Sequence, residues 1–445
     1  MTDSAAIGMN LAGVNYYSGQ FPFLDRYKTS GQWVARDSKY VPIGSPTLDA
    51  NGYPTAMLAG ARDMYQMIEL DPSSLPMNDV YVLRYTGEAT FTISSSKVIS
   101  QKPGEIVFQY SGGSQAQFSV YSINPDKPPS EIHIVRQDQL AAFEAGEIFN
   151  PAFVEKIEPF STLRFMDWSN TNQSTVSSWG DRKTLDSASW SSGGDTGSVP
   201  IEVQVALANK ARTNIWINIP TQADDDYVRK TLAYVHDNLD PSLKVKVEYS
   251  NEVWNWGFPQ AHYALDMGNK LFGKDVNGDG KIDASNPKEH VSDGFMQFYG
   301  YRSAQIATIA KQVFADAPSR QESVLGTQTA YKGLENSIFK GVQRIGDVSK
   351  LFDSYAVTTY FDTGKATEAD LLSWARGGEA GLAAGFAALK ASLDNTKSLN
   401  AYQATVAAKY GLDLVAYEGG THTTSYQYSA AAQPEIQAFL EKLNT

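Results

Sequence analysis

The hydrophobic and polar positions follow two different patterns along the chain. Between residues 37 and 136, short apolar runs alternate with Gly, Pro, Asn and Asp, and Val80, Val82, Phe91 and Ile93 fall near a period of two. A period of two with frequent turn residues is typical of antiparallel strands that bury one face. We therefore expect an antiparallel β-sandwich at 37–136.

The rest of the chain has the pattern of strands that alternate with helices. Apolar, β-prone runs occur at 7–17, 162–168, 213–220, 245–252, 323–330, 354–361 and 412–420. Helical stretches such as 224–239 and 298–314 lie between them. Nearly continuous apolar strands that alternate with helices predict a parallel sheet covered by helices. No Gly-rich phosphate loop follows these strands, so a (β/α)8 TIM barrel is favoured over an open doubly wound sheet.

The order of the two patterns predicts the domain organisation. The apolar run near the N-terminus precedes the predicted sandwich, so the sandwich is expected to be an insertion after the first barrel strand. The predicted organisation is therefore a first barrel strand and loop at 1–36, an inserted β-sandwich at 37–136, and the remainder of the barrel at 137–445.

The barrel strands counted in this way number seven. After the last of them, Ile436, Phe439, Leu440 and Leu443 recur at helical spacing and predict a final helix. A barrel of seven strands would leave an open seam with an unpaired edge. We therefore expect an eighth strand to come from a further segment of the polypeptide or from a second chain.

Composition narrows the possible partners. The chain has 49 acidic and 37 basic side chains, a net charge of -12, which argues against a nucleic-acid partner and favours a neutral or weakly charged substrate. It has no cysteine, so disulfides and thiolate zinc sites are excluded. No apolar run reaches the ~18 residues of a membrane span. The first residues lack the pattern of a signal peptide, and we expect a secreted or periplasmic protein from which that peptide is missing.

Two glutamates stand where predicted barrel strands end. In a (β/α)8 barrel, catalytic side chains lie at the carboxyl ends of the strands. Glu252 in "YSNE" and Glu418 in "AYEGG" are the glutamates that follow an apolar run in this position. Two carboxylates that face each other across a barrel mouth provide the acid and the nucleophile or base of glycoside hydrolysis. Taken alone, either glutamate is equally a solvated loop residue.

Both segments resemble motifs of one enzyme superfamily. "EYSNEVW", residues 248–254, resembles the fourth-strand Asn-Glu motif of the clan A glycoside hydrolases, which are retaining (β/α)8 glycosidases, and "LVAYEGG", residues 414–420, is similar to their seventh-strand nucleophile motif. The resemblance implies that Glu252 is the general acid/base and Glu418 the nucleophile. It also implies that Asn251 hydrogen-bonds the 2-hydroxyl of the substrate.

The same resemblance gives roles to two further residues. Arg164, at the end of the second strand, matches an arginine held against the nucleophile, and Tyr360, at the end of the sixth, falls where a Tyr or His orients it. An ion pair between Arg164 and another barrel carboxylate is the alternative. Strict strand alternation would point Asn251 and Glu252 in opposite directions, so we expect a bulge or sharp twist there.

Aromatic side chains near these glutamates are candidates for sugar binding, because the C–H patches of sugars stack on flat rings. Aromatic residues make up 12% of the chain, and Trp254 and Trp256 follow Glu252 directly. Trp168, at the end of the second strand, is a further candidate. His422 is expected to bind a sugar hydroxyl or to orient Glu418. The alternative for each aromatic residue is core packing.

A second motif predicts a calcium site. In "DVNGDGKID", Asp275, Asn277, Asp279, Lys281 and Asp283 match positions 1, 3, 5, 7 and 9 of an EF-hand-type loop, with Lys281 contributing its carbonyl. Position 12 is Asn286, where a bidentate Glu is expected, and the loop resembles those of dockerins. We expect structural Ca²⁺ here and no organic cofactor. A solvated turn is the alternative.

These observations favour a retaining glycoside hydrolase that cleaves a β-linked polysaccharide or oligosaccharide with two glutamates. The main alternative is a non-catalytic polysaccharide-binding protein. A polysaccharide lyase is disfavoured, because the acidic net charge does not suit an anionic substrate.

Overall fold

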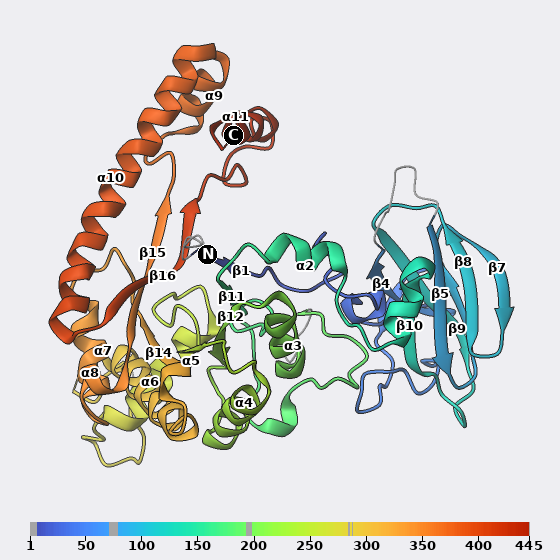
Figure 1. The fold of residues 1–445 in the computed structure, drawn as a ribbon, viewed down its shortest axis with the longest axis horizontal. Coiled ribbons are helices and arrows are strands. Elements are labelled where there is room, and N and C mark those ends of the chain that lie inside the picture. The colour runs from blue at the N-terminus through green and yellow to red at the C-terminus, as the bar shows by residue number, and fades with distance from the viewer. Residues whose placement is uncertain (1–6, 71–78, 193–197, 284, 287, 445) are drawn as a thin grey trace. The chain divides into compact units, whose positions relative to one another are not determined.

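The computed structural model describes residues 7–70, 79–192, 198–283, 285–286 and 288–444. Its largest sheet has seven parallel strands in chain order: β1 (Gly8–Asn10), β11 (Thr162–Arg164), β12 (Asn214–Ile219), β13 (Val245–Tyr249), β14 (Gln321–Gly326), β15 (Ser354–Phe361) and β16 (Asp413–Thr421) (Figure 1). Each predicted barrel strand is present. Parallel strands in chain order with helices between them make this sheet TIM-barrel-like, which confirms the predicted fold class.

Antiparallel sheets are inserted after β1, as predicted. One has the order β10-β5-β8-β7 and the other the order β3-β2-β4-β9-β6 (Figure 1). The strands are β2 (Val34–Arg36), β3 (Pro42–Gly44), β4 (Asp63–Glu69), β5 (Asp79–Thr86), β6 (Ala89–Ile93), β7 (Ser96–Lys102), β8 (Glu105–Tyr110), β9 (Gln115–Ile123) and β10 (Ser130–Arg136). Phe108 and Tyr81 from one sheet and Phe118 and Phe91 from the other share the buried core between them. Of the residues whose period of two predicted a sandwich, Phe91 and Ile93 lie in this core, whereas β5 contributes Tyr81 and Leu83 to it and not Val80 and Val82.

The helices lie mainly between the parallel strands. They are α1 (Leu140–Glu144), α2 (Pro151–Ile157), α3 (Ile201–Ala211), α4 (Asp225–Asn238), α5 (Pro259–Phe272), α6 (Gly294–Val313), α7 (Leu334–Val342), α8 (Val348–Leu351), α9 (Glu368–Arg376), α10 (Gly378–Tyr410) and α11 (Gln433–Leu443). The Asp224 side chain accepts a hydrogen bond from the Tyr227 amide and so caps α4, which begins with two more acidic residues. None of the helices in the described ranges combines the length and apolar character needed to cross a membrane.

The chain divides into two compact units. The first comprises Met1–Asn251, Phe258–Gln260 and Ile309–Gln321, and the second comprises Glu252–Gly257, Ala261–Thr308 and Glu322–Thr445. The first unit contains the sandwich and the strands β1 and β11 to β13. The second unit contains β15, β16 and nearly all of β14.

The second unit has its own hydrophobic core around α9, α10 and α11. Ile436, Phe439, Leu440 and Leu443 of α11 are buried there, which confirms the helix that their spacing predicted. The helix α10 is 33 residues long and runs beside β15. Gln403 of α10 fixes this packing, because its side chain accepts a hydrogen bond from the Tyr355 hydroxyl and donates one to a loop carbonyl.

Candidate active site

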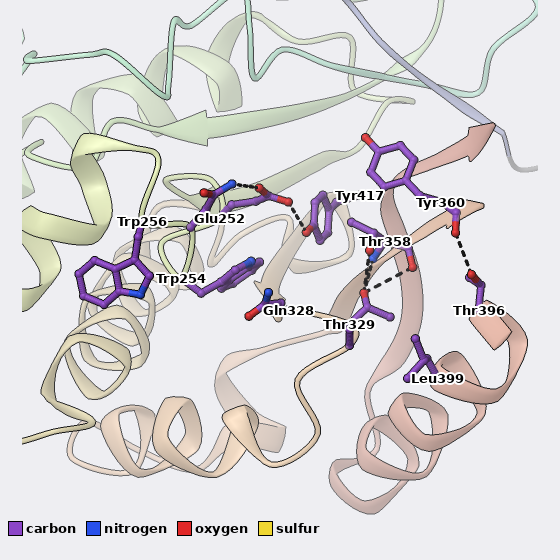
Figure 2. Close-up of a pocket in the computed structure, with 12 residues that line it drawn as sticks. Glu252, Trp254, Trp256, Gln328, Thr329, Thr358, Tyr360, Thr396, Leu399 and Tyr417 are labelled. Atoms are coloured by element: carbon purple, nitrogen blue, oxygen red, sulfur yellow. Dashed lines mark hydrogen bonds between the residues drawn. The ribbon is translucent and has the colours of Figure 1, made fainter. Parts of the chain in front are cut away.

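A pocket of about 570 Å³ lies in the second unit, where the carboxyl ends of β14, β15 and β16 meet the turn Glu252–Gly257 (Figure 2). The residues that line it are Glu252, Trp254, Asn255, Trp256, Gln328, Thr329, Ala330, Thr358, Tyr360, Thr396, Leu399 and Tyr417. Glu252 is the one carboxylate of this set, and the others are aromatic, amide, hydroxyl or aliphatic residues. Four predicted site residues are thus brought together: Glu252, Trp254, Trp256 and Tyr360.

The backbone after β13 leaves the extended conformation abruptly. Ser250 (φ 58°) and Glu252 (φ 40°) both adopt the left-handed conformation. The distortion expected at this strand end is therefore present, as two left-handed residues. Such a conformation costs a non-glycine residue about 1–2 kcal/mol. Ser250 is held in it by Asn218, whose amide donates to the Ser250 carbonyl at 2.8 Å, and by a 2.6 Å bond to the Thr221 hydroxyl.

Each oxygen of the Glu252 carboxylate has a neutral donor. The Tyr417 hydroxyl donates to Oε1 at 2.9 Å, and Nδ2 of Asn255 donates to Oε2 at 3.0 Å (Figure 2). Asn255 is itself fixed, because its Oδ1 accepts a bond from the Gly257 amide at 3.1 Å. The carboxylate is thus held in one plane at the edge of the pocket.

The two tryptophans after Glu252 have different environments. Trp254 is 8% exposed and packs edge-to-face on Tyr299, with ring centroids 5.9 Å apart. Gly326 of β14 permits this position, since a Cβ there would lie 3.2 Å from the indole. Trp256 is 49% exposed and lies beside Phe295. Trp254 therefore forms a wall of the pocket, and Trp256 presents an open ring face.

Trp168 does not have the environment predicted for it. Its side chain is fully buried, and its ring packs against those of Phe23, Phe153 and Phe165. A ring without an exposed face cannot stack on a sugar. The prediction of Trp168 as a sugar platform was wrong, because an apolar strand end is equally compatible with core packing.

Glu418 is bonded to a residue of the pocket without lining it. The Tyr360 hydroxyl donates to Oε2 of Glu418 at 2.6 Å, and the ring of His422 lies 5.3 Å from the Tyr360 ring. Tyr360 lines the pocket, whereas Glu418 and His422 are not among the lining residues. The tyrosine thus contacts the carboxylate that it was predicted to orient, and His422 contacts that tyrosine.

Tyr417, which the sequence analysis did not select, precedes Glu418 in the chain and contacts Glu252 through its hydroxyl. The pairing of β15 with β16 shifts by one residue, from Val357↔Ala416 to Thr358↔Glu418, so Tyr417 is the extra residue of a β-bulge. It is 4% exposed and lines the pocket. The signal that could have identified Tyr417 is an aromatic residue directly before Glu418. In the apolar run it could not be distinguished from an ordinary strand residue.

Arg164 and Asn251 belong to a buried network in the first unit. Arg164 binds Glu248 of β13 through Nε at 3.1 Å and Nη2 at 2.9 Å, and its Nη2 also donates to Oδ1 of Asn251 at 3.0 Å. The alternative interpretation of Arg164, an ion pair with another barrel carboxylate, is therefore confirmed. Burial raises the pKa of Glu248, and the guanidinium opposes this rise.

Asn251 is held at both ends of its amide. Its Oδ1 accepts the bond from Arg164, its Nδ2 donates to Asn172 at 3.0 Å, and the side chain is almost fully buried. Gln260 donates to the Asn251 carbonyl at 2.8 Å. The protein thus fixes the residue that precedes Glu252, while contact of Asn251 with a substrate hydroxyl stays a prediction.

Removal of the arginine should destabilise this network strongly. We expect Arg164→Met to lower the free energy of unfolding by about 3–5 kcal/mol, because Glu248 would remain buried without its countercharge. Urea denaturation measures the change.

A matched control is Arg376→Met, which breaks an ion pair with Glu435 whose side chains are 64% and 39% exposed. This change should lower the free energy of unfolding far less than Arg164→Met does, because solvent screens an exposed ion pair. Equal effects of the two substitutions would contradict a structural role for the buried pair.

The predicted calcium loop contains suitable oxygen donors that do not converge. Asp275 accepts bonds from the amides of Gly278 and Gly280, and Asp283 accepts from Ser285. Within the described ranges, no group of three or more His, Cys, Asp or Glu side chains is arranged to hold a metal ion. The chemistry of the donors fits Ca²⁺, whereas their arrangement in the structure does not form its coordination shell.

Comparisons with known proteins give distant structural likenesses. The chain is similar to the CBM22-1–GH10 modules of endo-1,4-β-D-xylanase 10B from Clostridium thermocellum, at 12% identity and a TM-score of 0.30, over 95% of this chain and 86% of that one. It is also similar to fungal β-1,4-galactanases, at 12% identity and a TM-score of 0.25, over 68% of this chain and 83% of that one. A further similarity is to a calcium-binding mutant of Bacteroides uniformis β-glucuronidase 2, at 9% identity and a TM-score of 0.28, over 86% of this chain and 43% of that one.

No protein-family model and no curated protein matches the sequence. The structural likenesses are to barrel glycosidases, at identities and TM-scores too low to assign a family or to carry an argument about function. The barrel-like fold is assigned from the strand order.

Proposed function

We propose that the chain is a retaining glycoside hydrolase that acts on a β-linked, uncharged polysaccharide or oligosaccharide outside the cytoplasm. The observation that carries the proposal is the environment of Glu252. Its carboxylate is fixed by two donors at the edge of a pocket, beside the exposed ring of Trp256. A fixed carboxyl group next to a sugar-sized cavity with an aromatic face is what acid-catalysed cleavage of a glycosidic bond requires.

The uncharged lining supports a neutral substrate. Asn255, Gln328, Thr329 and Thr358 offer amide and hydroxyl groups that can donate to and accept from sugar hydroxyls. Glu252 contributes the pocket's formal charge, and the whole chain carries a net charge of -12. An anionic sugar would meet like charge here.

In the proposed mechanism, Glu252 gives its proton to the glycosidic oxygen while Glu418 attacks the anomeric carbon. The bond to the leaving group breaks, and a covalent glycosyl ester forms on Glu418. Glu252, now ionised, takes a proton from water, and this water displaces Glu418 with a second inversion, so the configuration is retained. Support for Glu418 comes from its 2.6 Å bond with Tyr360, which lines the pocket and would hold the carboxylate beside it.

The test is the release of reducing ends from a panel of β-glucans, xylans and mannans, with Glu252→Gln as the inactive control. The configuration of the first product, followed by NMR, distinguishes retention from inversion. A wild-type protein that binds a glycan of the panel without releasing reducing ends would assign the second candidate function, a non-catalytic binding protein. Absorbance from unsaturated chain ends would assign a lyase.

Calcium binding by the loop 275–283 forms a separate part of the proposal. Binding would require Asp275, Asn277, Asp279 and Asp283 to turn from the loop's own amides toward the ion, together with the Lys281 carbonyl. We expect Ca²⁺ at 100 times its dissociation constant to stabilise the fold by about 2.7 kcal/mol, measured as a rise in the thermal midpoint. Asp275→Ala with Asp279→Ala should remove the rise. A midpoint that Ca²⁺ leaves unchanged in the wild type would refute the site.

A further inference from the structure

We propose that Tyr417 is a positioning residue for Glu252. Adjacent residues of β16 would then provide the nucleophile, Glu418, and the support for the acid, Tyr417. This inference rests on the proposed hydrolase function and extends it to a residue with no assigned role. Its basis is the bulge in β16. In a regular strand, successive side chains point to opposite faces, and here the extra residue allows Tyr417 to reach Glu252 while Glu418 contacts Tyr360.

The surroundings of Tyr417 limit its movement. It is 4% exposed, and its ring centroid lies 6.4 Å from that of Trp254 at an interplanar angle of 56°. Trp254 is in turn packed on Tyr299. The hydroxyl that contacts Glu252 therefore belongs to a buried ring that packs on Trp254, and this packing limits the movement of the hydroxyl (Figure 2).

The chemistry of the hydroxyl suits a group that changes its protonation state. Nδ2 of Asn255 can only donate, and it donates to Oε2 of Glu252. A phenol hydroxyl both donates and accepts. Tyr417 can therefore donate to Glu252 when this carboxyl group is ionised and accept a hydrogen bond from it when the group is protonated.

The expected consequence is a loss of general acid catalysis without a loss of binding. Misplacement of a catalytic group by about 1 Å costs about 100-fold in rate, and general acid help is worth about 10²–10⁴-fold. We expect Tyr417→Phe, which removes one oxygen atom, to lower kcat by ~10–100-fold on substrates with poor leaving groups while KM changes less than ~2-fold. In kcat/KM, which reports the first step, aryl glycosides with acidic leaving groups should lose less than ~3-fold, because this step needs little protonation of the leaving group.

The dependence on the leaving group provides the second readout, because a merely structural role would lower the rates on both classes of substrate equally. Tyr110→Phe is the matched control: it removes the hydroxyl of a buried tyrosine in the sandwich, which donates to the Gln115 carbonyl, and it should leave the kinetics unchanged.

The experiment measures kinetics on both classes of substrate, with the thermal midpoint of each variant as a check of folding. A folded Tyr417→Phe variant with wild-type rates would show that Tyr417 only packs, and equal losses on both classes would show a general structural effect. Complete loss in Tyr417→Phe beside an active Glu418→Gln variant would make Tyr417 the nucleophile and overturn the positioning role. A wild type without turnover on the panel overturns the hydrolase function itself, and this inference with it.

Discussion

Glu418→Gln is expected to lower kcat on every glycoside that the wild type cleaves by a factor on the order of 10⁶, the size of loss that follows removal of a catalytic nucleophile. The amide has nearly the shape of the carboxylate and can still accept the bond from the Tyr360 hydroxyl, so the fold should be kept. An amide cannot form the glycosyl ester of the first step, and activated leaving groups should therefore bring no recovery. Steady-state kinetics on aryl glycosides and polysaccharide measure the effect.

A chemical rescue distinguishes a missing nucleophile from a damaged site. Glu418→Ala leaves space beside Tyr360, and azide in that space can attack the anomeric carbon directly. The product would be a glycosyl azide of inverted configuration, formed at a rate that depends on the azide concentration. Wild-type activity of Glu418→Gln on polysaccharide would remove Glu418 from the mechanism and leave Glu252 as the site's catalytic carboxylate.

Much of the architecture could be predicted because burial leaves a periodic signature in the sequence. The near-continuous apolar runs that became β12 and β13 are buried on both faces, and the period of two in β6 and β8 marks strands that bury one face. Strand ends are also visible, since polar residues follow apolar runs. Glu252 and Tyr360 were therefore found at the correct edge of the barrel-like sheet.

The orientation of individual side chains could not be predicted in the same way. The bulge that turns Tyr417 toward Glu252 depends on the pairing of β16 with β15, and no local pattern records that pairing. The left-handed conformations of Ser250 and Glu252 could not be predicted from the sequence either, because the usual signal for a positive φ is glycine or asparagine. These local rules fail at the proposed site, where strained backbone and shifted registers are commonly concentrated.

The part of the pocket wall that α10 contributes is not visible from strand ends in the sequence. Thr396 and Leu399 line the pocket from the middle of this helix, and the Thr396 hydroxyl donates to the Tyr360 carbonyl at 2.8 Å. In the sequence, both residues lie in a long helical stretch with no unusual composition. Their position depends on the packing of α10 along β15, which is a tertiary contact.

Glu252→Ala is expected to separate the two halves of the proposed mechanism. General acid help is worth about 10²–10⁴-fold, so kcat/KM on polysaccharide should fall by about that factor. Aryl glycosides with acidic leaving groups need no proton, and their first step should stay close to the wild-type rate. Their second step lacks the base that activates water, so the glycosyl-enzyme should accumulate and appear as a burst of released phenol.

The contrast between substrates is the informative result, because a general loss of structure would affect both. Glu252→Gln controls for the side-chain volume that Glu252→Ala removes. It preserves this volume and the acceptor for the Tyr417 hydroxyl, and it removes the acidic proton. It should behave as Glu252→Ala does toward both substrates. If either variant kept wild-type activity on polysaccharide, Glu252 would not be the acid, and the pocket around it would instead be assigned to glycan binding.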